Sequence, residues 1–283
     1  MKTFAILQAR MGSSRLPGKV LLDLAGKPML QRVIERVRRA LTANDLLVAT
    51  TTNPADDPIA AFCAAQGIAC YRGSTHDVLD RYYQAARHLQ PDVIIRITAD
   101  CPLIDPAVID QTVQLMTDNG SLITDFACNR LPPPFGRTFP IGLDVEVCTF
   151  AALERAWKDS TETFHREHVM PFLYENVALS SPKQITDNYL LSTGISPRGF
   201  RIAQLHHQPD YGSLRWTVDT PEDLRFMREI FARLNGKPDF TWYDVLEIIH
   251  KEPELSHINA SVRHKTMTEV DERVNQETGK QIR

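Results

Sequence analysis

The sequence predicts an α/β protein in which a mostly parallel sheet lies between two layers of helices. Short apolar runs typical of buried strands alternate with longer amphipathic segments, and short polar loops join them. Such alternation is typical of a parallel sheet with helices on both faces. At 283 residues, with 43% hydrophobic and 24% charged residues, the chain has the composition of one large globular domain.

The first element is an apolar run, residues 3–7, that predicts a buried strand followed by a loop rich in glycine and serine. Three cations stand in this loop, Arg10, Arg15 and Lys19. Glycine lets the backbone approach a ligand, and the cations surround that ligand with positive charge. An amphipathic helix begins near residue 29. This order is that of a nucleotide-binding α/β domain and suits a polyphosphate. From the loop residues alone, however, we favour the alternative of a solvated surface loop.

The next elements continue the order of strand, helix and strand: residues 46–51, 59–66 and 68–71. Residues 78–89 then predict a helix with Asp77 at its N-terminus and Arg81 one turn later. From the spacing alone, we interpret these two residues as a helix cap and an i,i+4 ion pair.

Residues 93–98 predict the central strand, and Asp100 follows it directly. A carboxylate just beyond the end of a central parallel strand lies where ligands bind in open α/β sheets. Mg²⁺ is typically held by one or two carboxylates together with phosphate oxygens. We therefore expect Asp100 to hold Mg²⁺, with a simple turn cap as the alternative.

The middle of the chain leaves this regular order. After a helix that begins at residue 108, the proline-rich residues 131–136 predict an excursion from the sheet. Residues 141–147 return as a strand with alternating apolar and acidic residues, in which Asp144 and Glu146 share one face. We favour solvent exposure of these two carboxylates, and contact with a substrate is the alternative.

The last third of the chain contains a second carboxylate at the end of a predicted strand. Residues 214–218 alternate as in a strand, and Asp219 ends it. Thr220, a proline and two acids then predict the N-terminus of a helix. Residues 242–250 predict the final short helix. From residue 256 the chain turns polar, which predicts a flexible or loosely docked tail.

The loop from Ala9 to Lys19 reads Ala-Arg-x-Gly-Ser-x-Arg-Leu-Pro-Gly-Lys. It resembles the N-terminal signature of the sugar cytidylyltransferases, which include the CMP-KDO and CMP-acylneuraminate synthetases. Within that family, the residues of this loop are most similar to those of the branch of spore coat polysaccharide biosynthesis protein F. The resemblance covers residues 3–235, and its other specific parts are the Asp-x-Pro that starts at Asp100 and the Asp-Thr-Pro-Glu-Asp that starts at Asp219.

This resemblance implies a Rossmann-like fold of the nucleotide-diphospho-sugar transferase type. It also implies a cytidylyltransferase domain over residues 1–255, with an acceptor-site and dimerisation arm inserted at about 130–210, and a tail over 256–283. Homodimerisation is implied through the apolar groups of this arm, near residues 166–174. The implied reaction transfers CMP from CTP to an acidic sugar or related acceptor in cell-envelope or surface polysaccharide biosynthesis, and it releases pyrophosphate.

The resemblance also implies roles for particular residues. The catalytic cations are Arg10 and Lys19, and Mg²⁺ is held by Asp100 and Asp219. The nucleotide-binding residues are Arg10, Gly12, Ser13, Arg15, Lys19, Asp77 and Arg81. The acceptor-site candidates are Thr98, Asp144 and Glu146. Thr98 stands where the KDO-type enzymes have glutamine, so the identity of the acceptor stays open.

Composition narrows the remaining function classes. No stretch approaches the roughly 20 uninterrupted apolar residues of a membrane span, and the N-terminus shows no signal-peptide pattern, so we expect no membrane insertion and a cytoplasmic protein.

The first 40 residues hold nine Lys and Arg against two acids, in a chain of net charge −3. Such a basic patch beside an acidic body favours a small anion over nucleic acid. A glycosyltransferase that uses nucleotide sugars and a non-catalytic nucleotide-binding relative are the alternatives.

Overall fold

The computed structural model describes residues 1–118 and 120–263. Its centre is a ten-stranded sheet. From one end of the sheet to the other, the strands are β11 (Ala178–Leu179), β13 (Tyr189–Ile195), β14 (Arg201–His207), β9 (Phe126–Cys128), β10 (Glu146–Thr149), β6 (Val93–Thr98), β1 (Thr3–Gln8), β4 (Asp45–Thr51) and β5 (Cys70–Gly73), and β12 (Lys183–Gln184) also pairs with β13.

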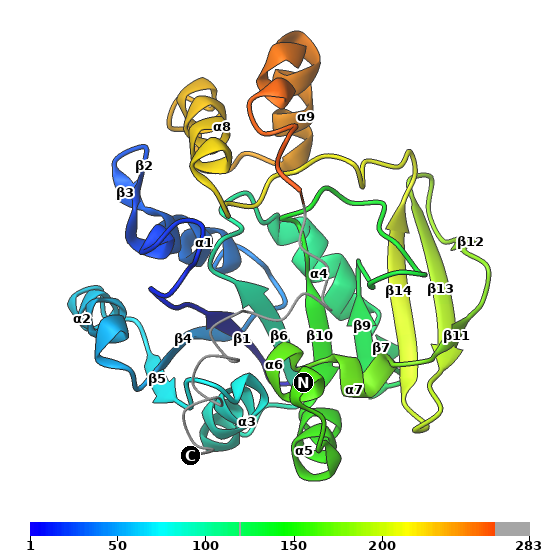
Figure 1. Ribbon diagram of the computed structural model, residues 1–283. Helices are drawn as coiled ribbons and strands as arrows, with labels where there is room; N and C mark the ends of the chain where they lie inside the picture. Colours follow the sequence, from blue (N-terminus) through cyan, green and yellow to red (C-terminus); the bar gives the residue numbers. More distant parts are fainter. Residues whose placement is uncertain (119, 264–283) are drawn as a thin grey trace, which may run out of the picture.

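The strands β6, β1, β4 and β5 are parallel neighbours, whereas β10 joins β6 antiparallel (Figure 1). Two short hairpins lie outside the central sheet: β2 (Asp23–Leu24) with β3 (Lys27–Pro28), and β7 (Thr117–Asp118) with β8 (Ser121–Leu122). The predicted α/β class with a large, mostly parallel central sheet is confirmed.

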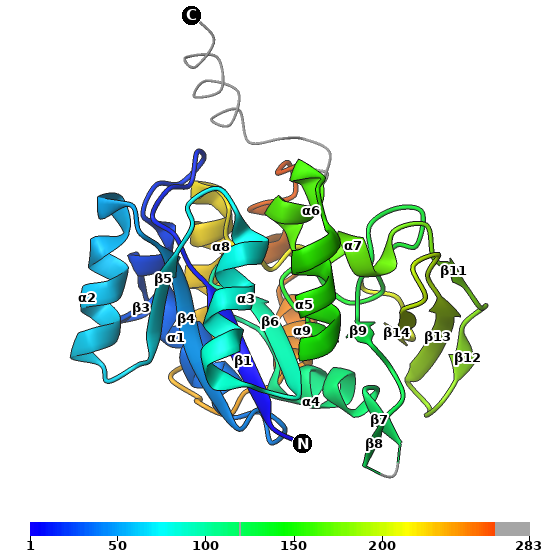
Figure 2. The ribbon, with the colours of Figure 1, turned by 90° about the horizontal axis from the view of Figure 1, so that it is seen from below.

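Helices cover both faces of the sheet. One layer consists of α1 (Met29–Val37), α2 (Asp57–Ala65), α4 (Pro106–Gln114), α8 (Pro221–Arg233) and α9 (Trp242–Lys251). The other consists of α3 (Val78–Leu89), α5 (Phe150–Asp159), α6 (Thr163–His168) and α7 (Pro171–Tyr174). Figure 2 shows α3 and α5 in front of the sheet, with α8 and α9 behind it.

The central strands have apolar residues on both faces, as this arrangement requires. In β1, Ala5 and Leu7 belong to the core beneath the first helix layer, whereas Ile6 belongs to the core beneath the second. All three side chains are fully buried. Parallel strands that are covered on both faces read as continuous apolar runs, and this explains the sequence pattern that predicted them. No helix among the described residues is both long and apolar enough to cross a bilayer.

The segment before Asp219 is extended but is not a strand, so the prediction for residues 214–218 is wrong. A single bridge pairs Arg215 with Ile141. The backbone N–H of Trp216 donates to the Ile141 carbonyl, and that of Val218 donates to the Asp100 carbonyl at 2.9 Å. The alternating burial arises because Trp216 and Val218 point into the core while the backbone is held by these separate contacts.

The structure bears on two further expectations. The apolar side chains at 169–174 that were assigned to a dimerisation arm are buried in the core of the same chain, beneath α3 and α5. In the predicted tail, the described residues 256–263 include Asn259, which is only 4% exposed. Residues 264–283 of that tail lie outside the described part of the chain.

Candidate active site

The basic loop leaves the carboxyl end of β1 and is anchored to the neighbouring strand. Asp56 lies at the end of the short helix η2 (Pro54–Asp56) and is only 3% exposed. It accepts a hydrogen bond from the backbone N–H of Met11 at 2.7 Å and another from the hydroxyl of Thr51. At the far end of the loop, Gly18 donates to the Met11 carbonyl at 2.9 Å and adopts a positive φ of 70°. The loop is therefore closed on itself and fixed to the sheet.

This closure turns Lys19 inward, at the start of the short helix η1 (Lys19–Leu21), toward two aspartates from distant parts of the chain. Its ammonium group donates to Asp100 Oδ2, Asp219 Oδ1 and the Val218 carbonyl, each at 2.8 Å. The two carboxylate oxygens thus lie no farther apart than twice that distance. The structure brings together the cation and both carboxylates that sequence analysis assigned to one site.

The charges of this cluster stabilise one another. Burial alone lowers the pKa of Lys19, but the negative charges of Asp100 and Asp219 outweigh burial, so the pKa is raised. Burial also opposes ionisation of the two carboxyl groups, yet Lys19 lowers the pKa of both. At neutral pH the site therefore contains one ammonium ion between two carboxylates.

The arrangement fits a magnesium ion only in part. No group of three or more His, Cys, Asp or Glu residues that could hold a metal occurs within residues 1–118 and 120–263. Two converging carboxylates are nevertheless the protein ligands that Mg²⁺ uses when phosphate oxygens complete its shell. Asp100 and Asp219 could therefore hold Mg²⁺ together with phosphate oxygens, but not as a site formed by protein ligands alone.

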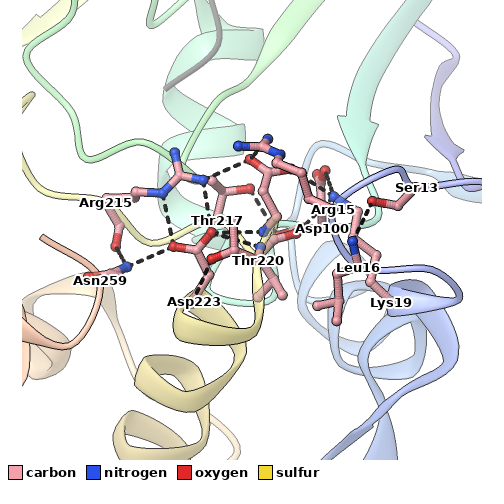
Figure 3. A network of polar contacts seen from close by, with 12 residues as sticks. Ser13, Arg15, Leu16, Lys19, Asp100, Arg215, Thr217, Thr220, Asp223 and Asn259 are labelled. Carbon is pink, nitrogen blue, oxygen red and sulfur yellow. Dashed lines mark hydrogen bonds and ion pairs between the residues drawn. The ribbon is translucent and has the colours of Figure 1, made fainter. Parts of the chain in front are cut away.

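A network of polar contacts holds Asp219, and Figure 3 shows its members Arg215, Thr220 and Asp223. Arg215 donates to Asp219 Oδ2 at 2.8 Å and forms two hydrogen bonds of 2.9 Å with Asp223. Asp223 is fully buried at the start of α8, where it also closes a capping box with Thr220. Arg15 contacts Asp219 from the loop side at 3.1 Å. Both oxygens of Asp219 thus face cations.

A cavity of about 180 Å³ opens beside the two aspartates. It is lined by Arg96, Thr98, Asp100, Cys101, Arg130, Ile141, Asp144, Val145, Glu146, Thr217 and Asp219. The antiparallel register of β10 and β6 places Glu146 opposite Arg96, with which it forms an ion pair. Asp144 pairs with Arg137 at 2.8 Å. The interpretation that Asp144 and Glu146 face solvent is therefore wrong, because both line the cavity and pair with partly buried arginines.

The cavity has a hydrogen-bond donor that a ligand could use. Within the described residues, Arg96 Nε is buried and has no hydrogen-bond partner. Burial lowers the pKa of this arginine, but Glu146 outweighs burial, so the group stays charged. The thiol of Cys101 also reaches the cavity, and burial followed by the charge of Asp100 raises its pKa well above the ordinary value. This thiol is protonated at neutral pH, which does not suit a nucleophile.

The remaining nucleotide candidates lie around the loop and the start of α3. Asp77 caps α3 by accepting the backbone N–H of Asp80 at 2.8 Å, but its ion-pair partner is Arg166 rather than the predicted Arg81. Arg81 is 1% exposed and donates to the Ser74 carbonyl, while its Nε has no partner within the described part of the chain. The ion pair of Asp77 with Arg166, which lies 89 residues away in the sequence, replaces the predicted i,i+4 pair with Arg81.

Arg10 and Ser13 occupy different parts of the loop. Burial lowers the pKa of Arg81, and the positive charge of Arg10 lowers it further. The Ser13 hydroxyl accepts the backbone N–H of Leu16 at 3.3 Å and shapes the loop beside Gly12. The loop therefore carries Arg10 near its start and turns Lys19, at its end, toward the aspartates.

Sequence reasoning missed several residues that build the site: Asp56, Arg96, Arg130, Arg137, Arg215 and Asn259. One signal was available, because a charged residue within the apolar central strand, as Arg96 is, needs a buried partner. Arg215 and Asn259 gave no such signal, since their partners are fixed only by the fold.

Comparisons with known proteins agree with this geometry. The family model described as cytidylyltransferase matches residues 4–230. The chain is 30% identical over 255 residues to spore coat polysaccharide biosynthesis protein SpsF of Bacillus subtilis, covering 89% of this chain and 95% of that protein. It is 38% identical over 255 residues to the 3-deoxy-manno-octulosonate cytidylyltransferase of Geotalea uraniireducens, covering 81% and 98%.

A solved structure shows the same fold. The cytidylyltransferase of Leptospira borgpetersenii superposes with a TM-score of 0.78 at 30% identity, covering 93% of this chain and 100% of that chain. The family match spans the loop, both aspartates and the start of α8. The chain therefore belongs to the cytidylyltransferase family and is a nucleotidyltransferase.

Proposed function

We propose that this protein transfers CMP from CTP to an acidic sugar or a related acidic acceptor and releases pyrophosphate. The observation that carries the proposal is the contact of Lys19 with Asp100 and Asp219 at the mouth of the cavity that contains Arg96. A basic loop for phosphates on one side and a polar cavity on the other suit a reaction between a nucleotide and a second substrate. Membership of the cytidylyltransferase family supports CTP as the donor.

In this reaction an oxygen of the acceptor attacks the α-phosphorus of CTP. A new P–O bond forms, the bond to the pyrophosphate oxygen breaks, and the attacking hydroxyl loses its proton. Such a transfer depends on positioning and charge neutralisation more than on covalent chemistry of the protein. We assign Arg10, Arg15 and Lys19 to the triphosphate, with Arg10 and Lys19 offsetting the charge that develops on the α-phosphate and the leaving group.

The nucleoside end is assigned to the space around Arg81. Its buried Nε lacks a hydrogen-bond partner within the described residues, and the positive charge of Arg10 opposes that of Arg81. A ligand oxygen would accept the missing hydrogen bond and, if negatively charged, would offset the repulsion between the two cations. We also assign Asp77, Gly12 and Ser13 to the nucleotide, and Asp77 lies next to Arg81, which donates its backbone N–H to the Asp77 carbonyl. The open Nε of Arg96 supports an acidic group on the second substrate, with Thr98, Asp144 and Glu146 beside it in the cavity.

We assign Mg²⁺ to Asp100 and Asp219, where it would neutralise phosphate charge and lower the pKa of the attacking hydroxyl. The contact of both carboxylates with the Lys19 ammonium group supports a cation site here. A metal held by these two carboxylates would replace the Lys19 ammonium group between them, and Lys19 would then be available to the phosphates. We also propose a homodimer, and relatives named for coat polysaccharide and octulosonate chemistry support a role in surface polysaccharide synthesis.

The test is pyrophosphate release with Mg²⁺ and each of the four nucleoside triphosphates, against acidic sugars and phosphorylated sugars. We expect release with CTP and a single acceptor class, and none from an Asp100→Asn control. Release with a different nucleotide alone would overturn the choice of CTP. Absence of both release and CTP binding by calorimetry would overturn the function.

A further inference from the structure

Asn259 lies beyond the stretch matched by the family model, which ends at residue 230. It follows the short helix η3 (Pro253–His257), and its side chain is buried against the start of α8. The side-chain amide donates to two acceptors in the network behind Asp219. One is the Arg215 carbonyl at 3.1 Å, and the other is Asp223 Oδ1 at 3.0 Å.

These two acceptors belong to the residues that fix Asp219. Arg215 fixes its side chain through the 2.8 Å contact with Oδ2. Asp223 fixes its main chain, because Asp223 Oδ2 accepts the backbone N–H of Asp219 at 3.0 Å. Asp223 is fully buried, so a donor lost from it cannot be replaced by bulk water. Asn259 joins both supports of Asp219 through a single amide (Figure 3).

We infer that Asn259 is a positioning residue that lets the C-terminal segment set the geometry of Asp219 for the metal–nucleotide complex. It acts through Arg215 and Asp223 and does not touch the substrates. The inference rests on the proposed role of Asp219 as a metal ligand. Partners behind a metal ligand matter because they fix its orientation, and their loss typically weakens metal binding about 10- to 100-fold.

The test measures CTP binding to the full chain by calorimetry, with and without Mg²⁺ and without any acceptor. We expect wild-type protein to bind CTP more tightly with Mg²⁺. Asn259→Ala should reduce this gain about tenfold and leave the Mg²⁺-free affinity unchanged. Asn259→Asp keeps the shape of the side chain but removes its donors and adds charge beside Asp223, so its loss should be at least as large.

Two controls separate positioning from folding. Ile258→Ala removes a neighbouring apolar side chain that packs on the same core and should leave both affinities unchanged. Asp219→Asn should abolish the gain from Mg²⁺. The inference is overturned if Asn259→Ala keeps the full gain, or if it weakens binding equally with and without Mg²⁺. Wild-type protein that binds no CTP would overturn the proposed function itself, and CTP binding without any gain from Mg²⁺ would overturn the metal role of Asp219.

Discussion

Lys19 has an environment that few lysines have, because its ammonium group is buried between two carboxylates and a carbonyl. Removing a charge from water is costly unless opposite charges and hydrogen bonds compensate it. Here the compensation is mutual, so each of the three groups depends on the other two. A change at Lys19 therefore leaves Asp100 and Asp219 facing each other without the ammonium group between them.

We expect Lys19→Met to reduce pyrophosphate release by at least about 100-fold, the usual loss when one preorganised charge partner of a transition state is removed. The free energy of unfolding should fall, because two carboxylates lose their shared cation, but the fold should persist, since Arg15 and Arg215 still pair with Asp219. The measurement is turnover at saturating CTP, with far-ultraviolet circular dichroism as the check on folding. Lys27→Met, which removes an exposed cation paired with Glu35, is the matched control and should keep its activity. Near-normal turnover in Lys19→Met would contradict the assigned role.

Asp219 makes stability depend on pH in a defined direction. Lys19, Arg15 and Arg215 outweigh burial and lower its pKa in the folded state below the value of about 3.9 expected when unfolded. A carboxyl group of this kind stabilises the fold above its unfolded pKa, and the stabilisation disappears as the pH falls toward the folded pKa.

Asp219→Asn should therefore be less stable than wild type at pH 7, by about 2 kcal/mol in the free energy of unfolding. The difference should shrink as the pH falls below about 4. Urea unfolding of both proteins from pH 7 to pH 3 measures it. A difference that stays constant over this range would show that the charge of Asp219 is not its cause.

At the scale of elements, the approach of two segments positions Asp219. At Gly142, the segment that precedes β10 passes close to the backbone of Trp216 and Thr217, which precede α8. Gly142 has a φ of +108°. A Cβ atom added there would lie 2.5 Å from the Trp216 carbonyl oxygen and 2.8 Å from the Thr217 nitrogen. Both contacts are with backbone, so a side chain at this position must displace the chain that leads to Asp219.

We expect Gly142→Ala to lower the free energy of unfolding by about 2–4 kcal/mol and to reduce turnover as well. Gly26→Ala is the matched control, since Gly26 also has a positive φ of 82° but its added Cβ would meet nothing within 4 Å. It should cost only the conformational part, about 1 kcal/mol, with activity intact. Urea unfolding and pyrophosphate release report on both. Equal effects of the two substitutions would show that close approach at Gly142 is unimportant.

Elements that depend on local pattern were predictable from the sequence. The helix over 78–89 and the strand over 93–98 have the predicted bounds, because a cap or turn residue stands at the ends of a clear apolar periodicity. The segment 214–218 was not predictable, since its backbone bonds go to Ile141 and Asp100. The predicted ion pair of Asp77 with Arg81 was wrong for the same reason: the true partner, Arg166, belongs to another helix that only the fold brings close.

At the scale of the whole molecule, the sheet gathers the site from distant parts of the chain. Lys19 and Asp100 follow the neighbouring parallel strands β1 and β6, whose carboxyl ends meet at one edge. Asp219 joins them because Val218 pairs with the Asp100 carbonyl. The two aspartates could be proposed together from the sequence, whereas the arginines around them required the register of β6 against β10.

The proposed homodimer requires apolar side chains that are exposed on the surface of one chain. The apolar groups at 169–174 lie inside the chain and cannot form a subunit contact without unfolding part of the core. Large apolar side chains are exposed instead near the β11–β13 end of the sheet, where Ile195 is 67% and Ile185 is 47% exposed. An exposed sheet end with apolar residues is suited to pairing with a second chain.

We therefore expect any homodimer to form through this end of the sheet. Light scattering should give wild-type protein twice the mass of one chain and Ile195→Lys the mass of a single chain, because a buried, unpaired lysine opposes association. Leu41→Lys alters a residue that is 91% exposed elsewhere on the surface, and it should remain dimeric. A wild-type monomer would contradict the proposed dimer, and a dimeric Ile195→Lys would place the contact on another face.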